Sequence, residues 1–482
     1  MELDPAGDGW HDEFMTAPKY LVIAIASLAY AAPGLAQEAS GRAGDRAAPP
    51  TLQASLGLPE GVRISGSIRP RYETLANQFV AGRTGDDEIF NLRSLLKIEA
   101  DAGPLTFVGE LLDSRLIAGN EGGGAAGEID TLEPVQLYGV WKSRDALAPG
   151  AEFDLRAGRF TMDVGSRRLI ARANFRSFMQ SFDGVHATWT ASDKLKVTAF
   201  AVHPATREPS DTASELDNEV ALNPSNDSIA FTGAHFDAPL PFGIHGEFYV
   251  FGFDEKDASD APSRNRDLLT IGGRLRKESA DTAFDFDLEY AHQSGTMRAT
   301  TSPLDVTDLD HDASMLHAEG GYTFDMPMSP RISLHYDLAS GDASPTDNES
   351  GRLDTLFGDR AFELGPTSIW GAISRSNLSS PGIRLEIAPD EASDAYIMLR
   401  QVDLAEARDR FSNSGVVDIT GASGTDVGQQ VEVRYRRWIE KDVLRLSLGG
   451  AALFNGGFLD TAPNATGQGD AFYGYTELTW TF

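Results

Sequence analysis

The sequence contains no cysteine, so disulfide bonds and thiolate metal sites are excluded. It also has few long apolar runs. Apart from one stretch near the N-terminus, no run approaches the roughly 18 residues of a membrane-spanning helix. Basic residues are scarce as well, with 41 Lys and Arg against 72 Asp and Glu and a net charge of −31. Because binding to phosphates needs a basic face, this balance argues against a nucleic-acid partner.

The one apolar stretch has the layout of a secretory signal. Residues 20–32 (YLVIAIASLAYAA) follow Lys19, and small residues precede a potential cleavage point after Ala36. This apolar core is too short for a spanning helix. The sequence therefore predicts an exported protein.

The N-terminal boundaries follow from this signal. Residues 1–14 are acidic, unlike the positively charged start of a signal peptide, so we expect translation to begin at Met15. Residues 15–36 are then the signal peptide, and residues 37–60, rich in Ala, Gly and Pro, are a flexible lead-in. The folded part is expected to be a single domain, 61–482.

From Gly61 onward the dominant pattern has period two. In the last segment, Leu478, Trp480 and Phe482 alternate with Glu477 and Thr479. Side chains on a strand point to opposite faces in turn, so each such segment has an apolar and a polar face. Eighteen segments show the pattern: 61–73, 88–101, 104–113, 134–142, 152–160, 182–190, 194–203, 228–237, 243–253, 267–277, 282–293, 314–324, 330–339, 380–388, 394–403, 428–438, 442–452 and 471–482.

The connections alternate between short and long. The short ones range from two residues (102–103) to nine (143–151), and the long ones from thirteen (254–266) to forty (340–379). A soluble β-sandwich or propeller does not require a long loop at every second connection. The pattern favours an all-β, up-and-down antiparallel transmembrane barrel of about 18 strands in the bacterial outer membrane. Its short turns would lie in the periplasm and its long loops outside the cell.

Most of the long loops are acidic. The loop at 204–227 carries six carboxylates against Arg207 alone, and the loop at 294–313 carries four against Arg298. One interpretation is a solvated surface in contact with lipid and lipopolysaccharide. The other is a divalent-cation site, for which Ca²⁺ would need six or more converging oxygens. We expect no cofactor, with Ca²⁺ at the acidic loops as the alternative.

One long loop, residues 161–181, is basic. It contains Arg167, Arg168, Arg172 and Arg176 against Asp163, and its aromatic residues could pack against a wall. We expect this loop to fold inward and narrow the pore, where guanidinium groups would offer forked donors to carboxylates or phosphates. The alternative is that these arginines pair with lumen acids or contact lipopolysaccharide phosphates.

The polar faces of the strands add further candidates. The inward faces carry both arginines and carboxylates, many of which must pair across strands. The pore-lining residues expected from these faces are Arg69, Arg71, Arg93, Arg156, Arg434 and Arg436.

Several short motifs resemble the alginate export family of outer-membrane proteins. They are 155–160 (LRAGRF), 165–170 (GSRRLI), 174–176 (NFR) and 181–185 (SFDGV), with further matches between 330 and 378. The resemblance implies an eighteen-stranded monomeric barrel whose arginine-lined constriction passes anionic polysaccharide outward. It also implies that Arg159, Arg167, Arg168 and Arg176 line the pore, and that Asp183 is a structural or pore acid.

Three functions are compared on these grounds. The first is a channel for anionic polysaccharide or other anions, with possible periplasmic secretion partners. The second is a nutrient-uptake porin for small organic acids or sugars, which would use the same arginines in the inward direction. The third is an outer-membrane enzyme. The histidines lie on separate predicted strands with no Gly-x-Ser-x-Gly elbow, so we expect no enzyme.

Overall fold

The structure is a computed structural model that describes residues 56–119, 128–257, 262–278 and 283–482. The expectations for residues 1–14 and 15–36, and nearly all of 37–60, therefore lie outside the described residues. Within the described part, no helix is both long and apolar enough to cross a membrane.

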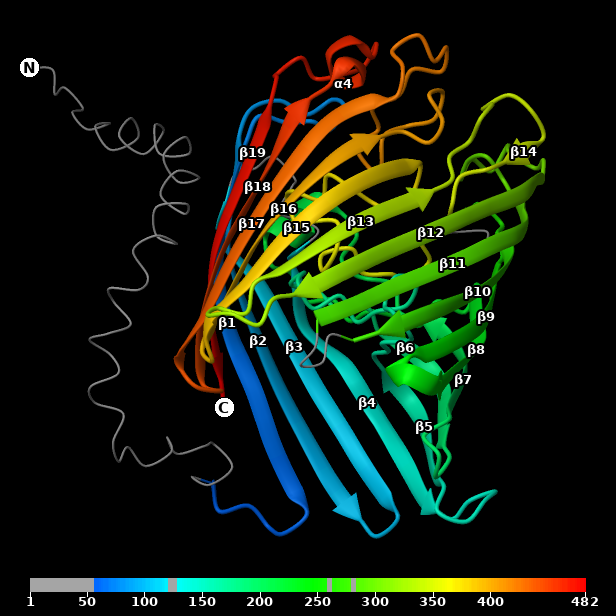
Figure 1. Ribbon diagram of the computed structural model, residues 1–482. Helices are drawn as coiled ribbons and strands as arrows, with labels where there is room; N and C mark the ends of the chain where they lie inside the picture. The colour runs from blue at the N-terminus through cyan, green and yellow to red at the C-terminus, as the bar shows by residue number, and fades with distance from the viewer. Residues whose placement is uncertain (1–55, 120–127, 258–261, 279–282) are drawn as a thin grey trace, which may run out of the picture.

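The chain forms one closed antiparallel sheet, visible as a tilted barrel in Figure 1. Each wall strand pairs with its sequence neighbours, and the first strand pairs with the last. The wall strands are β1 (Val62–Ala76), β2 (Asp87–Ala102), β3 (Leu105–Gly119), β4 (Asp130–Arg144), β5 (Glu152–Phe160), β6 (Phe182–Thr190), β7 (Lys196–Pro204), β8 (Ile229–Pro239), β9 (His245–Glu255), β10 (Asp267–Lys277), β11 (Ala283–Met297), β12 (Leu309–Thr323), β13 (Arg331–Ala339), β15 (Leu378–Asp390), β16 (Ser393–Asp403), β17 (Asp426–Glu440), β18 (Leu444–Asn455) and β19 (Ala471–Thr481).

The remaining elements are short and belong to the connections. Strand β14 (Glu349–Ser350) pairs in parallel with β12, and the helices are α3 (Thr212–Leu216), η3 (Pro241–Gly243) and α4 (Gly457–Thr461). Eighteen strands thus form the wall, and each of the eighteen predicted segments overlaps one of them. The predicted fold class is confirmed.

The barrel is closed by pairing between its first strand, β1, and its last strand, β19. The amide of Gly66 on β1 donates to the carbonyl of Phe482, and the amide of Phe482 donates to the carbonyl of Gly66. Lipid offers no hydrogen-bonding partners, so a spanning sheet needs this closure to satisfy its edge groups. The beginning of β1 and the C-terminus of the chain both lie at the rim of the barrel that carries the short turns (Figure 1).

The outward faces are apolar. Residues such as Leu137, Ile271, Leu288 and Leu334 are exposed on the outside, at 67%, 42%, 45% and 64%. Aromatic residues gather on the outside near the short turns, among them Trp141, Phe153, Phe236, Phe248, Tyr322, Phe324 and Trp480. This is the arrangement by which a barrel meets the hydrocarbon core and the interface of a bilayer.

This arrangement predicts the effect of a charge on the outer wall. Replacing Ile271 by Arg at the middle of β10 is expected to reduce the free energy of unfolding by about 2–4 kcal/mol, because the guanidinium would face hydrocarbon. Reversible urea unfolding in lipid vesicles, followed by tryptophan fluorescence, measures the change. The control is Ile271→Val, which keeps the surface apolar. Equal stability of the two variants would contradict a lipid-facing wall.

Candidate functional site

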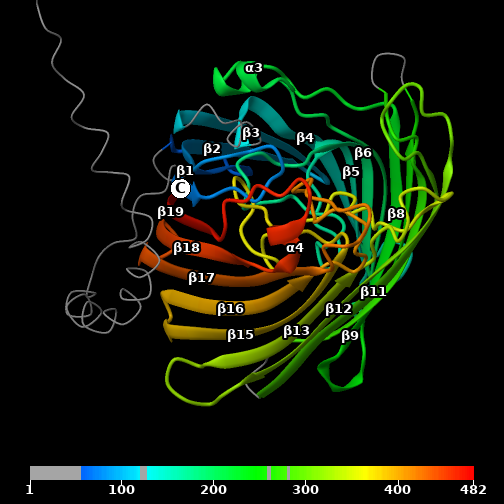
Figure 2. The same ribbon diagram turned by 90° about the horizontal axis from the view of Figure 1, so that it is seen from above.

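Two long connections fold into the barrel and join there (Figure 2). They are loop 161–181, between β5 and β6, and loop 351–377, between β14 and β15. Ile170 and Phe357 form a parallel β-bridge between them. The amide of Ala171 donates to the carbonyl of Phe357 at 2.9 Å, and the amide of Phe357 donates to the carbonyl of Leu169 at 3.0 Å. We call this two-loop assembly the constriction.

An aromatic cluster on the inner wall holds the constriction on one side. The Phe357 ring packs against Phe182, Phe231 and Phe253, with ring centroids 5.0, 5.1 and 6.0 Å apart. These wall residues alternate with outward-facing residues on β6, β8 and β9, so their rings point into the barrel. Apolar packing of Phe357 therefore holds the constriction against the wall formed by β6, β8 and β9.

Arg168 connects the two loops to the barrel wall electrostatically. Its side chain is 1% exposed and contacts three carboxylates: Glu363 of the second loop, and Asp287 and Glu289 of β11. The Nε atom donates to Glu363 at 3.0 Å, and one Nη donates to Asp287 at 2.9 Å. Burial by itself lowers the pKa of Arg168, but these acids raise it well above its ordinary value. We call these four residues the Arg168 cluster.

A second group of arginines holds the first loop against β1 and β2. Arg69 donates to the carbonyls of Asn174 and Phe175 and to the hydroxyl of Ser177. Arg93 donates to the carbonyl of Asn174 and, farther along the loop, to that of Arg176. Much of their donor capacity is therefore used to position loop backbone.

Arg71 acts in the same way but also pairs with acids. It binds Glu477 at 2.7 Å and Glu73 at 3.4 Å, donates to the Phe175 carbonyl at 2.6 Å and lies over the Phe175 ring.

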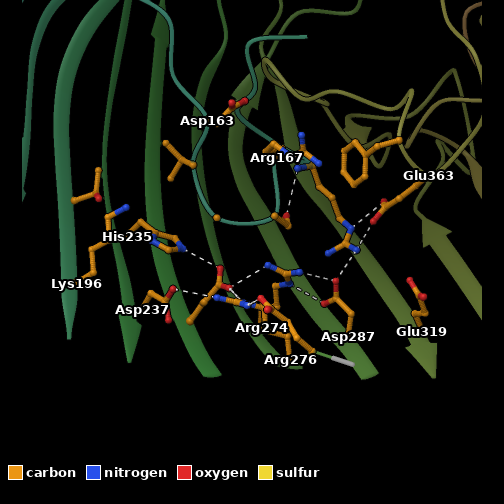
Figure 3. Close-up of a pocket in the computed structure, with 18 of the residues that line it drawn as sticks. Asp163, Arg167, Lys196, His235, Asp237, Arg274, Arg276, Asp287, Glu319 and Glu363 are labelled. Carbon is orange, nitrogen blue, oxygen red and sulfur yellow. Dashed lines mark hydrogen bonds and ion pairs between the residues drawn. The ribbon is translucent and has the colours of Figure 1, made fainter. Parts of the chain in front are cut away.

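One cavity beside the constriction has a mixed lining (Figure 3). It measures about 760 Å³ and reaches toward the short turns, where Lys277 and Glu278 lie. Basic and acidic side chains are equally represented in it, and most are paired. Arg274 binds Asp287 at 2.6 Å, and Arg276 binds Glu247 at 2.8 Å. We call this space the mixed cavity.

The expected residues Arg156 and Arg167 also line the mixed cavity. Within the described residues, neither has an ion pair. Arg156 lies over the Tyr138 ring at 5.9 Å, and Arg167 lies over the Phe362 ring at 4.6 Å.

A second cavity, on the other side of Arg167, is strongly basic. It measures about 400 Å³ and lies along β1, β2 and β17–β19. Its lining includes seven arginines and only three carboxylates: Arg69, Arg71, Arg93, Arg167, Arg434, Arg436 and Arg445 against Asp359, Glu432 and Glu477. Arg434 and Arg436 share Asp394, at 3.2 and 3.0 Å. We call this space the basic cavity.

The other sequence candidates lie elsewhere. Arg172 binds Glu110 of the wall strand β3 at 2.8 Å and Thr161 of its own loop at 3.0 Å. Arg176 lines a third cavity, between the loops.

Arg159 and Asp183 pair with each other at 2.8 Å. They are strand partners in register with Leu137, whose side chain is 67% exposed on the outside. Register partners share a face, so this register places the pair on the outward face and not in the lumen, in contrast to the expectation that they line the pore.

The described residues contain one group with metal-ligand spacing. Asp287, His317 and Glu363 bring one ligand atom each within 4.8 Å of one another. Two of these three residues, Asp287 and Glu363, already form ion pairs with Arg168. A metal ion there would have to displace a buried guanidinium, so this chemistry fits the arginine better than a cation. Calcium at the acidic outer loops stays a prediction.

Sequence reasoning missed the second loop. Residues 351–377 supply Phe357, Glu363, Arg360 and Arg375, all in or beside the constriction. The forty-residue length of the connection was visible, but the part that enters the barrel, 351–377, carries three acids and three arginines, so no basic excess marked it.

Comparison with known proteins gives the family. The alginate export family matches residues 62–471. The chain belongs to that family. Solved structures with a similar fold include Pseudomonas aeruginosa OccK8 (OprE), at 13% identity and a TM-score of 0.57, covering 88% of this chain and 98% of that one. OccK5 (OpdH) from the same organism has 13% identity and a TM-score of 0.54, covering 87% and 98%. None of the curated proteins compared with the chain matches it.

The family match and the similar structures are consistent with the localisation and the general function that the barrel indicates. The alginate export family and the porin-like fold place the protein in the bacterial outer membrane. Together they indicate a channel rather than an enzyme.

The Arg168 cluster predicts a large effect of a single substitution. Among the described residues, Arg168→Ala leaves Glu289 buried without a cationic partner and leaves Glu363 with Arg375 as its one arginine partner, so we expect a loss of about 3–5 kcal/mol of stability. Thermal unfolding followed by circular dichroism measures this loss. A double-mutant cycle with Glu363→Gln should show strong coupling between the two side chains. Additive effects would mean that Arg168 does not hold the two loops together.

Proposed function

We propose that this protein is an outer-membrane channel that passes anionic polysaccharide of the alginate type, or other anionic solutes, through an arginine-lined pore. The observation that carries the proposal is the basic cavity, with seven arginines against three carboxylates beside the constriction. This charge is concentrated locally in a chain whose net charge is −31. A lumen wall of one sign raises the local concentration of the opposite ion.

The arginines differ in how free they are to meet a solute. Arg71 is 1% exposed and is engaged with Glu477, Glu73 and loop backbone. Arg167 and Arg445 have no ion pair within the described residues, and each lies beside an aromatic ring instead. Arg434 and Arg436 share Asp394 as their one ion-pair partner among the described residues, and Arg434 also lies over the Tyr396 ring. We propose that these four contact the passing anion, while Arg69, Arg71 and Arg93 position the loop.

The selectivity of the open channel tests this assignment. In planar bilayers under a potassium chloride gradient, the parent should favour anions. The double variant Arg434→Gln/Arg436→Gln should lower the anion-to-cation permeability ratio roughly three- to tenfold, equivalent to about 1 kcal/mol of attraction in a wet pore. The control is Arg437→Gln, which removes one positive charge from the residue next to Arg436, in register with the outward Leu446. Cation selectivity in the parent would sink the proposal.

The size of the cargo separates export of a polymer from uptake of small acids. Hexameric oligouronates are added on the turn side, and single blockades of the current are timed against voltage. Passage of the polymer predicts blockades that shorten as the driving voltage rises. Blockades that lengthen with voltage, together with free conduction of monomeric uronate, would favour the nutrient-uptake function.

A further inference from the structure

A third cavity lies on the outer side of the constriction. Its lining comes entirely from three long loops: loop 161–181, loop 351–377 and Asn413 of loop 404–425. It measures about 220 Å³, more than a single water molecule requires. Arg168 lines both this space and the mixed cavity, so the Arg168 cluster lies between them. We call this space the outer cavity.

Two arginines of the outer cavity have no acidic partner. Arg168 and Arg375 also line it, but both bind Glu363. Arg176 has only the Phe178 ring at 5.2 Å, and Arg360 has neither an ion pair nor a side-chain hydrogen bond among the residues that the structure describes. These two charges are therefore available to a ligand.

Arg360 is held in a confined place. Its Nε atom is buried without a partner, and its Nη2 atom lies so close to Gly371 that a Cβ on that glycine would be 2.7 Å away. Burial lowers the pKa of Arg360 to about 9, and the neighbouring charge of Arg176 contributes to this shift. The acid that precedes it in the chain, Asp359, accepts a hydrogen bond from the amide of Ala361. A buried cation that lacks a counter-ion is costly, and an anion would relieve that cost.

Two hydroxyl groups complete the outer cavity. Thr367 and Ser374 are 1% and 3% exposed, line the same space, and have side-chain oxygens without a hydrogen-bond partner. Buried polar groups are nearly always satisfied, so the protein presents guanidinium and hydroxyl groups together to something polar. A bare inorganic anion would use the guanidinium groups. A sugar acid would use the hydroxyl groups as well.

We propose that the outer cavity is a binding site for one acidic sugar unit, whose carboxylate binds Arg360 and Arg176 and whose hydroxyls bind Thr367 and Ser374. The proposal rests on the anion-channel function above and deepens it. The pore would not only conduct anions but also hold one sugar acid at its exit on the loop side. The site is separate from the basic cavity, with which it shares only Asp359 among the residues that line the two spaces.

Side-specific block of single channels tests the site. The probe is D-glucuronate added on the loop side in potassium chloride, with neutral D-glucose as the matched solute. The parent should show transient blocks with glucuronate and none with glucose. Arg360→Gln should weaken the apparent affinity roughly tenfold or more, the usual loss for a charge-assisted hydrogen bond. Arg408→Gln, at an exposed arginine of loop 404–425, should leave the affinity unchanged.

A second pair of variants separates sugar from plain anion. Thr367→Val and Ser374→Ala should weaken block by glucuronate and leave block by sulfate unaltered. Equal loss in Arg360→Gln and Arg408→Gln, or block from the turn side alone, would overturn the site. Failure of the channel proposal would appear independently as cation selectivity of the parent in the gradient experiment, so the two failures are distinguishable.

Discussion

The closed backbone ladder is the constraint on which everything else depends. Lipid supplies no donors or acceptors, so each wall strand must pair on both sides, and β1 must meet β19. Once the ladder is closed, alternation leaves every second side chain facing inward. The apolar residues of the outer face contact lipid. The inner face can therefore carry charged side chains, provided that each has water or a partner of opposite charge.

The interior is organised by the way those charges are paired. On the β9–β13 side, arginines and carboxylates largely neutralise one another, as Arg274 and Asp287 do. On the β17–β2 side, arginines outnumber acids. The two inserted loops lie between these regions, fixed by aromatic packing of Phe357 on one side and by guanidinium bonds to the backbone on the other. The two sides of the lumen therefore differ in charge.

Much of the fold could be predicted from the sequence because period two is imposed by the membrane itself. Strands β5 and β6 have the predicted bounds, since the lengths of spanning strands are limited by bilayer thickness. Strands β3 and β12 extend beyond their predicted bounds on the loop side, where hydrogen bonding continues after the regular alternation of apolar and polar residues has ended.

The site was only partly predictable. The basic excess of loop 161–181 indicated that it enters the barrel, but loop 351–377 has balanced charges, and its partners are distant in sequence. Arg156 and Arg159 are three residues apart on one strand, so alternation alone places them on opposite faces. Applying that rule strictly would have separated Arg159 from the lumen candidates. Which arginine is neutralised, as Arg168 is, depends on contacts that no local pattern contains.

The bridge between Ile170 and Phe357 has a consequence for how the barrel is assembled. Loop 161–181 leaves the wall after the fifth strand, whereas its partner segment arrives only with the connection that precedes β15. The bridge therefore joins segments that lie almost 190 residues apart in the chain. A chain interrupted before residue 351 would lack both the partner segment of this bridge and strands β15–β19, so it could neither join the two loops nor close the wall.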